Sequence, residues 1–99
     1  MADRNLFPPA YLFANLLANA TTVVKTGAGE LARIVINNAG ASSNVCQVFD
    51  GLTASGTPIA TIDTVELNGR VLEYGCRFAT GLTIVIGTGT AADITVVYS

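Results

Sequence analysis

The stretch TTVVKTGAGELARIVIN, residues 21–37, places two runs rich in β-branched residues on either side of a glycine-containing segment. β-Branched residues favour strands, and glycine adopts the backbone angles that tight turns require. In the second run, Ile34 and Ile36 share one side of a strand, because successive side chains point to opposite faces. The stretch therefore predicts two β-strands joined by a hairpin turn at residues 27–29.

The same glycines also match a dinucleotide-binding pattern. Gly27 to Ala32 fits G-x-G-x-x-A, and Asp50 lies about where a ribose-binding acid would be expected. The pattern binds a pyrophosphate only when it opens a helix, whose N-terminus then faces the phosphates. Residues 33–36 are instead a strand-forming run, so no cofactor site is predicted.

Short β-branched runs separated by glycine, asparagine and serine continue to the end of the chain. Strands are expected at residues 21–26, 31–37, 45–50, 59–63, 70–74, 82–87 and 93–98. Asn68-Gly69 is a dipeptide favoured in tight hairpin turns, and Gly87-Thr88-Gly89 indicates another turn. Without helical interludes, antiparallel pairing is favoured. The fold class predicted is all-β, a roughly seven-stranded antiparallel sandwich of the jelly-roll or Ig-like kind over residues 21–99.

Alternation also predicts which side chains face the core. The inward residues expected are Ile34, Ile36, Leu72, Tyr74, Leu82, Ile84, Ile86, Ile94, Val96 and Tyr98. The opposite positions include Val35, Val85 and Val97, although a strand with one face in water usually carries polar residues there. These three valines are therefore candidate interface residues.

Residues 1–20 form an N-terminal apolar arm outside the strand pattern. The arm ends in Ala18-Asn19-Ala20 and imitates a secretion signal, but Asp3 and the two prolines argue that it is retained. Both a short helix beginning near Pro9 and an extended arm are compatible with its composition. An apolar arm needs a surface to cover, either its own sandwich or a neighbouring subunit. Its candidate docking residues are Leu6, Phe7, Tyr11, Phe13, Leu16 and Leu17.

Charge is scarce in this chain. Only 12% of its 99 residues are charged, about half the share of a typical globular domain, and 51% are hydrophobic. An uncharged surface of this kind indicates contacts with neighbouring subunits, so a homo-oligomer is expected. The five cations are scattered singly and form no basic stripe, which argues against direct nucleic-acid binding. The sequence contains no run of about 20 apolar residues, so no membrane span is predicted.

Residues suited to catalysis or metal binding are few. The chain has no histidine, the usual general base near neutral pH, and its carboxylates form no recognisable pair. No D-x-D-x-D-G calcium loop is present. Cys46 and Cys76 are expected to be buried, reduced thiols, with a single disulfide as the alternative. We therefore expect a protein that is not an enzyme, without catalytic residues, cofactor or metal.

Several segments, read together, resemble small structural proteins of tailed bacteriophages. The segments are residues 26–29 (TGAG), 31–44 (LARIVINNAGASSN), 48–51 (VFDG), 56–63 (GTPIATID), 77–85 (RFATGLTIV) and 92–96 (ADITV). The resemblance covers about residues 21–99 and leaves out the arm. It implies a β-sandwich encoded in a virion morphogenesis module, with no family site residues.

The resemblance implies a virion protein assembled in the host cytoplasm. The leading expectation is a capsid cement or decoration subunit that bridges neighbouring capsid subunits, with the major capsid protein or other virion proteins as partners. A small neck, tail or fibre component is the first alternative. A host-receptor or glycan-binding module is the second, although the loops at residues 38–44 and 51–56 contain no aromatic residue of the kind frequent in sugar sites.

Overall fold

The computed structural model describes residues 10–99, which form eight β-strands. The strands are β1 (Leu12–Leu16), β2 (Ala20–Thr26), β3 (Gly29–Asn38), β4 (Val45–Asp50), β5 (Ala60–Asp63), β6 (Val71–Phe78), β7 (Gly81–Gly87) and β8 (Asp93–Tyr98). The described residues contain no helix. The all-β class expected from the sequence is confirmed.

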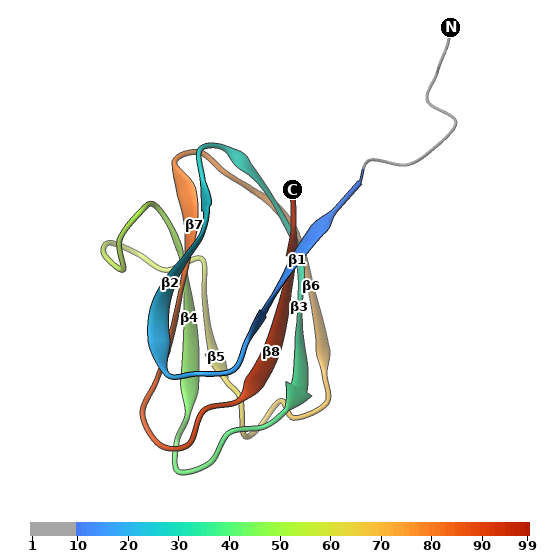
Figure 1. Cartoon of the computed structure of the whole chain (residues 1–99), viewed down its shortest axis with the longest axis vertical. Helices are drawn as coiled ribbons and strands as arrows, with labels where there is room; N and C mark the ends of the chain where they lie inside the picture. The colour runs from blue at the N-terminus through green and yellow to red at the C-terminus, as the bar shows by residue number, and fades with distance from the viewer. Residues whose placement is uncertain (1–9) are drawn as a thin grey trace, which may run out of the picture.

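The strands form two antiparallel four-stranded sheets that face each other in a sandwich-like arrangement (Figure 1). The first sheet has the order β1-β8-β3-β6 and the second has the order β2-β7-β4-β5. The first half of the chain therefore pairs with the second half in reverse order: β1 with β8, β2 with β7, β3 with β6 and β4 with β5.

The predicted count of seven strands was wrong, because β1 is an eighth. Leu12–Leu16 pairs with β8 along its whole length, from Leu12 opposite Tyr98 to Leu16 opposite Ile94. The described part of the arm is thus extended rather than helical, and it completes an edge of the chain's own first sheet. Good intrinsic helix formers adopt a strand here because β8 offers unpaired backbone groups along its free side.

The glycine turns were predicted as hairpins, and that interpretation was also wrong. The turn at residues 27–29 joins β2 to β3, Asn68-Gly69 lies between β5 and β6, and residues 87–89 lie between β7 and β8. In each case the two strands belong to different sheets. Turn residues show where the chain changes direction, but the nearest strand in sequence need not be its hydrogen-bonding partner.

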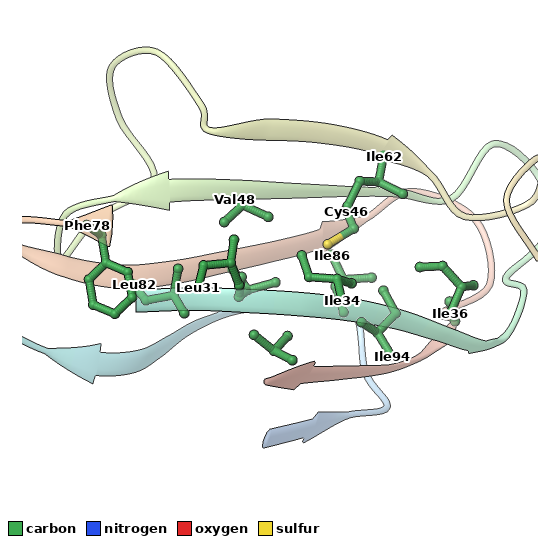
Figure 2. Packing of buried hydrophobic residues seen from close by; sticks show 13 residues of the cluster. Leu31, Ile34, Ile36, Cys46, Val48, Ile62, Phe78, Leu82, Ile86 and Ile94 are labelled. Carbon is green, nitrogen blue, oxygen red and sulfur yellow. The ribbon is translucent and has the colours of Figure 1, made fainter. Parts of the chain in front are cut away.

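One hydrophobic core lies between the two sheets (Figure 2). Its fully buried members from the first sheet include Leu31, Ile34 and Ile94, and those from the second include Val48 and Ile84. The inward faces predicted from alternation are confirmed. The buried residues of the predicted set are Ile34, Ile36, Leu82, Ile84, Ile86, Ile94 and Val96. Leu72, Tyr74 and Tyr98 are partly buried against them.

A β-bulge keeps the core face of β3 continuous. Leu31 and Ile34 are both fully buried, although residues three apart in a regular strand point to opposite faces. Against β8, Leu31 and Arg33 pair with the consecutive residues Tyr98 and Val97, so Ala32 is the extra residue in β3. Against β6 the extra residue is in β6, because both Tyr74 and Gly75 stand opposite Ala32. Gly75 lies opposite this shift on β6 with φ of 57°, a left-handed conformation that glycine adopts without steric cost.

Four connections meet at one end of the molecule: β1–β2, β3–β4, β5–β6 and β7–β8 (Figure 1). Ala41 and Thr90 exchange two backbone hydrogen bonds across this end, of 3.0 and 2.9 Å. We call residues 38–44 and 87–92 the loop end. The two hydrogen bonds join the β3–β4 connection to the β7–β8 connection, and each of these connections runs between the two sheets.

Candidate functional site

The largest exposed hydrophobic side chains gather along β1. Tyr11 is 42% exposed, Leu12 58%, Phe13 73% and Leu17 64%. They supply half of the exposed large hydrophobics found among residues 10–99; the others are Val23, Leu52, Val65 and Val71. We call Tyr11 to Leu17 the β1 edge, because β1 lies at the rim of its sheet.

The structure separates the predicted docking residues into three groups. Tyr11, Phe13 and Leu17 are exposed on the β1 edge, whereas Leu16 is half-buried and packs against the core. Leu6 and Phe7 lie outside the described residues. The prediction from sequence omitted Leu12. Its spacing could have identified it, because Leu12 stands four residues before Leu16 and therefore lies on the same side of a strand.

Phe13 lies on the outer face of the first sheet. It is directly opposite Val97 on β8, which in turn is opposite Arg33 on β3. Val97 alternates with the buried Val96, so this row points away from the core. The outer row thus begins with two apolar residues and ends in a charged one.

The three valines are not brought together. Val97 and Val35 share the outer face of the first sheet, where Val35 lies opposite Thr95 and Val71. Val85 belongs to the second sheet, opposite Thr21 and Gln47. All three are half-buried. Val97 therefore adjoins the β1 edge, Val35 lies one strand farther away on the same face, and Val85 lies on a different surface.

Polar side chains beside Phe13 are hydrogen-bonded to one another. Asn15 Nδ2 donates to Asp93 Oδ1 at 2.7 Å, and Asn37 Nδ2 donates to the same oxygen at 3.1 Å. Both amides also lie within hydrogen-bond distance of Thr95 Oγ1, at 3.3 and 2.8 Å. Because the Asn15 amide is occupied by β8, it does not make the β1 edge polar.

The ion pair between Arg33 and Glu73 limits the apolar area on this face. Arg33 Nε lies 3.1 Å from Glu73 Oε2, and the two side chains are 40% and 67% exposed. Exposed pairs of this kind contribute about 0–1 kcal/mol, so its main effect is to keep this side of the sheet hydrated. In the row that contains Phe13, the apolar side chains are therefore those of β1 and β8, whereas Val35 and Val71 form a separate apolar pair on β3 and β6.

Cys46 does not have the environment of a reactive nucleophile. Cys46 and Cys76 are both free, and Cys46 is buried in the core. The expectation of a buried thiol was wrong for Cys76, which is only partly buried because it lies on the edge strand β6. Burial raises the pKa of the Cys46 thiol to about 12, because the thiolate would lose its hydration. At neutral pH Cys46 is therefore a neutral thiol and behaves as a small core side chain.

The carboxylate of Asp50 is used to hold a turn. It accepts backbone hydrogen bonds from Ala79 and Thr80, each of 2.9 Å, and a longer one from Gly81. These bonds, first that of Ala79 and then that of Thr80, hold the pKa of Asp50 below its ordinary value. Within residues 10–99, no three cysteine or carboxylate side chains are grouped as a metal site would require.

A shallow pocket of about 310 Å³ lies where β3 begins and β6 ends. It is lined by Ala28, Gly29, Glu30, Arg77 and Ser99. The Tyr11 hydroxyl donates to Glu30 Oε2 at 3.3 Å, so the pocket adjoins one end of the β1 edge. Its charged lining residues are Glu30, which is half-buried, and Arg77, which is exposed, and the pocket offers a ligand little apolar surface.

In the part of the chain that the structure describes, no helix is long and apolar enough to cross a membrane. A scan against protein-family models and searches of curated proteins and solved structures found no match. Among the described residues, the β1 edge holds the most exposed of the large hydrophobic side chains, Phe13.

Proposed function

We propose that the two sheets form a jelly roll. A jelly roll is a double-sheet arrangement of eight strands in two Greek keys. Support comes from the strand orders β1-β8-β3-β6 and β2-β7-β4-β5. The antiparallel pairs β1–β8, β2–β7, β3–β6 and β4–β5 belong alternately to the first and the second sheet. Jelly rolls occur in viral capsid and lectin domains, so the topology is compatible with a virion role.

We propose that the chain is a non-enzymatic structural protein of a tailed-phage virion, and that it cements the head by bridging neighbouring capsid subunits. The resemblance over residues 21–99 supports the virion assignment. The observation that carries the cement role is the β1 edge, where Phe13 is 73% exposed in a segment without charge. Large apolar side chains in contact with water indicate a surface that becomes buried against another subunit of an assembly.

In this role the chain acts by adding buried area. Each copy contacts the major capsid protein or another virion protein and associates with further copies of itself, without direct contact with nucleic acid or membrane. A ligand that binds only the assembled state stabilises that state by mass action. A repeating lattice multiplies this effect, since many weak contacts are made at once. The protein would be located in the virion and be assembled in the host cytoplasm.

The copy number of the chain in purified particles tests this proposal. Quantitative mass spectrometry should find an amount comparable with that of the major capsid protein. Absence from particles would refute the virion role. A small multiple of three, six or twelve copies per particle would refute the cement role and favour a neck, tail or fibre component.

Lectin domains also use the jelly roll, which supports a host-receptor or glycan-binding module as the second candidate. In such a module the loops would contact the sugar. Residues 38–44 and 51–58 contain no aromatic side chain, and Asn44 in the first loop is fully buried. A glycan array separates the two functions: specific binding would favour the module, and no binding would favour the structural role.

A further inference from the structure

Open sheet edges are sites where another strand can add, and proteins normally protect them with charge, bulges or short strands. The two sheets have four such edges, formed by β1, β6, β2 and β5. They differ in how they are protected.

Three of the four edges carry a protective feature. β6 bears Glu73 and Arg77, and a bulge shifts its pairing with β3 between Glu73 and Cys76. β2 shifts register between Val23 and Lys25, which places a bulge and a cation on its edge. β5 has only four residues and ends at Asp63. Each of these features disfavours the addition of a further strand.

The β1 edge has none of these features. Its pairing with β8 runs from Leu12 to Leu16 without a register shift. Neither proline nor a charged residue occurs between residues 10 and 24. Among the described residues, no strand pairs with the other side of β1. An uninterrupted, uncharged edge with exposed apolar side chains is suited to β-strand addition.

The side chains of β1 show what the added strand would cover. Leu12 lies opposite Tyr98, which lies opposite the fully buried Leu31, so Leu12 continues a core-facing row. It is nevertheless 58% exposed, because the sheet ends at β1. Phe13 is exposed on the outer face of the same strand. A strand added here would cover both faces of the edge at once.

We propose that β1 pairs antiparallel with β1 of a second copy, so that two four-stranded sheets join into one. The absence of charge favours a second copy as the occupant, since two identical edges then meet without like-charge repulsion. A twofold axis near Ala14 gives the fullest overlap and places Leu12 opposite Leu16 of the second copy on the core side. On the outer face, the two Phe13 rings become diagonal neighbours, within reach of each other across the paired strands.

This inference deepens the self-association included in the proposed function and rests on the proposed function only to that extent. A dimer could form whether or not the chain belongs to a capsid. The solution mass of the chain tests the pairing, whereas the copy number in particles tests the capsid role. Failure of one is therefore distinguishable from failure of the other.

The solution mass of the full chain should be twice the 10.2 kDa of one copy, measured by light scattering over a range of concentrations. Phe13→Lys places a cation at the centre of the proposed contact and should weaken dimerisation about tenfold or more. Phe13→Glu should do the same. Because Phe13 is exposed, both variants should keep the circular dichroism spectrum of the wild type.

Val71→Lys is the matched control. Val71 is 54% exposed and lies on β6, the opposite edge of the same sheet. It shares the outer face with Phe13, so this variant adds the same charge at a position outside the proposed contact. It should dimerise like the wild type. A wild type that is monomeric throughout, or a Val71→Lys variant weakened as much as Phe13→Lys, would overturn the proposal.

Cross-linking tests the register. In a Cys76→Ser background, Ala14→Cys should form a covalent dimer with a short thiol cross-linker, because the proposed axis places Ala14 beside its own copy. Val71→Cys in the same background should not. The reverse pattern would place the contact on the β6 edge and would also overturn the proposal.

Discussion

The Asn44 side chain is fully buried at the loop end and joins three connections. Its Nδ2 lies 2.9 Å from Asn19 Oδ1, at the start of β2. The same nitrogen lies 3.2 and 2.9 Å from the carbonyl oxygens of Gly87 and Thr88. Its Oδ1 accepts a 2.8 Å hydrogen bond from Thr64. One amide therefore satisfies polar groups from several parts of the chain.

We expect Asn44→Ala to lower the free energy of unfolding by about 2–3 kcal/mol, because the buried groups around it lose their partners. Asn37→Ala is the control, since its hydrogen bonds to Asp93 and Thr95 are exposed and water can replace them. It should cost about 1 kcal/mol or less. Denaturant titrations measure both values, and equal losses would contradict this account of Asn44.

Asp50 gives the stability of the fold a pH dependence. Its pKa is lowered in the folded state from an ordinary value of 3.8, so it favours folding above the unfolded pKa. This contribution is lost as pH falls through the folded pKa. We expect Asp50→Asn to lose less stability than the wild type over this acidic range. Thermal unfolding followed as a function of pH measures the difference, and parallel curves would show that the Asp50 hydrogen bonds do not contribute.

At the scale of elements, the positions of the strands were largely predictable. The runs predicted at residues 45–50, 82–87 and 93–98 match β4, β7 and β8, because β-branched residues and a period of two are local signals. β6 extends to Phe78, beyond the predicted end at Tyr74. The missed segment contains Gly75. Glycine usually interrupts a strand, but here it accommodates the bulge.

The site was less predictable than the strands. Apolar composition identified the region of Tyr11, Phe13 and Leu17, and these side chains are exposed in the structure. The composition of residues 10–20 did not show that β1 forms, because alanine and leucine fit a helix as well as a strand. Pairing with β8, which is distant in sequence, decides that element.

Position 89, in the loop end, requires glycine for two reasons. Its φ is 61°, and an added Cβ would overlap the carbonyl oxygens of Ala41 and Ser42. We expect Gly89→Ala to destabilise the fold by about 2–3 kcal/mol, since the left-handed strain and the overlap act together. Thermal unfolding provides the measurement.

Gly87→Ala is the matched control for Gly89→Ala. Gly87 lies two residues earlier, and an added Cβ would meet nothing within 4 Å. Its substitution should change stability by less than about 1 kcal/mol. Similar effects at both positions would mean that the close approach of Gly89 to residues 41–42 is unimportant.

At the scale of the whole molecule, both sheets share one core, so they should unfold together. Cys46 reports on this unfolding because its thiol is buried and its pKa is raised to about 12. In a Cys76→Ser variant, we expect Cys46 to react with a thiol reagent only through global unfolding. The free energy obtained from labelling should equal that from denaturant titration.

Two outcomes of the labelling experiment are informative. Agreement between the free energies would show that the second sheet does not open without the first. A labelling free energy well below the global value would show that Cys46 becomes accessible through a local opening, and would contradict the single cooperative core. Cys46→Ala in the same background controls for reaction elsewhere in the chain.

The sequence by itself determined the strand-forming runs, their core faces and the scarcity of charge. These properties depend on residue type and on the alternation of neighbouring side chains. Only the tertiary structure decided which strands pair, that the glycine turns cross between sheets, and that Leu12 and Phe13 lie on an open edge. The physical reason is that every residue except proline offers the same backbone donor and acceptor, so strand partners are selected by the burial of one shared core.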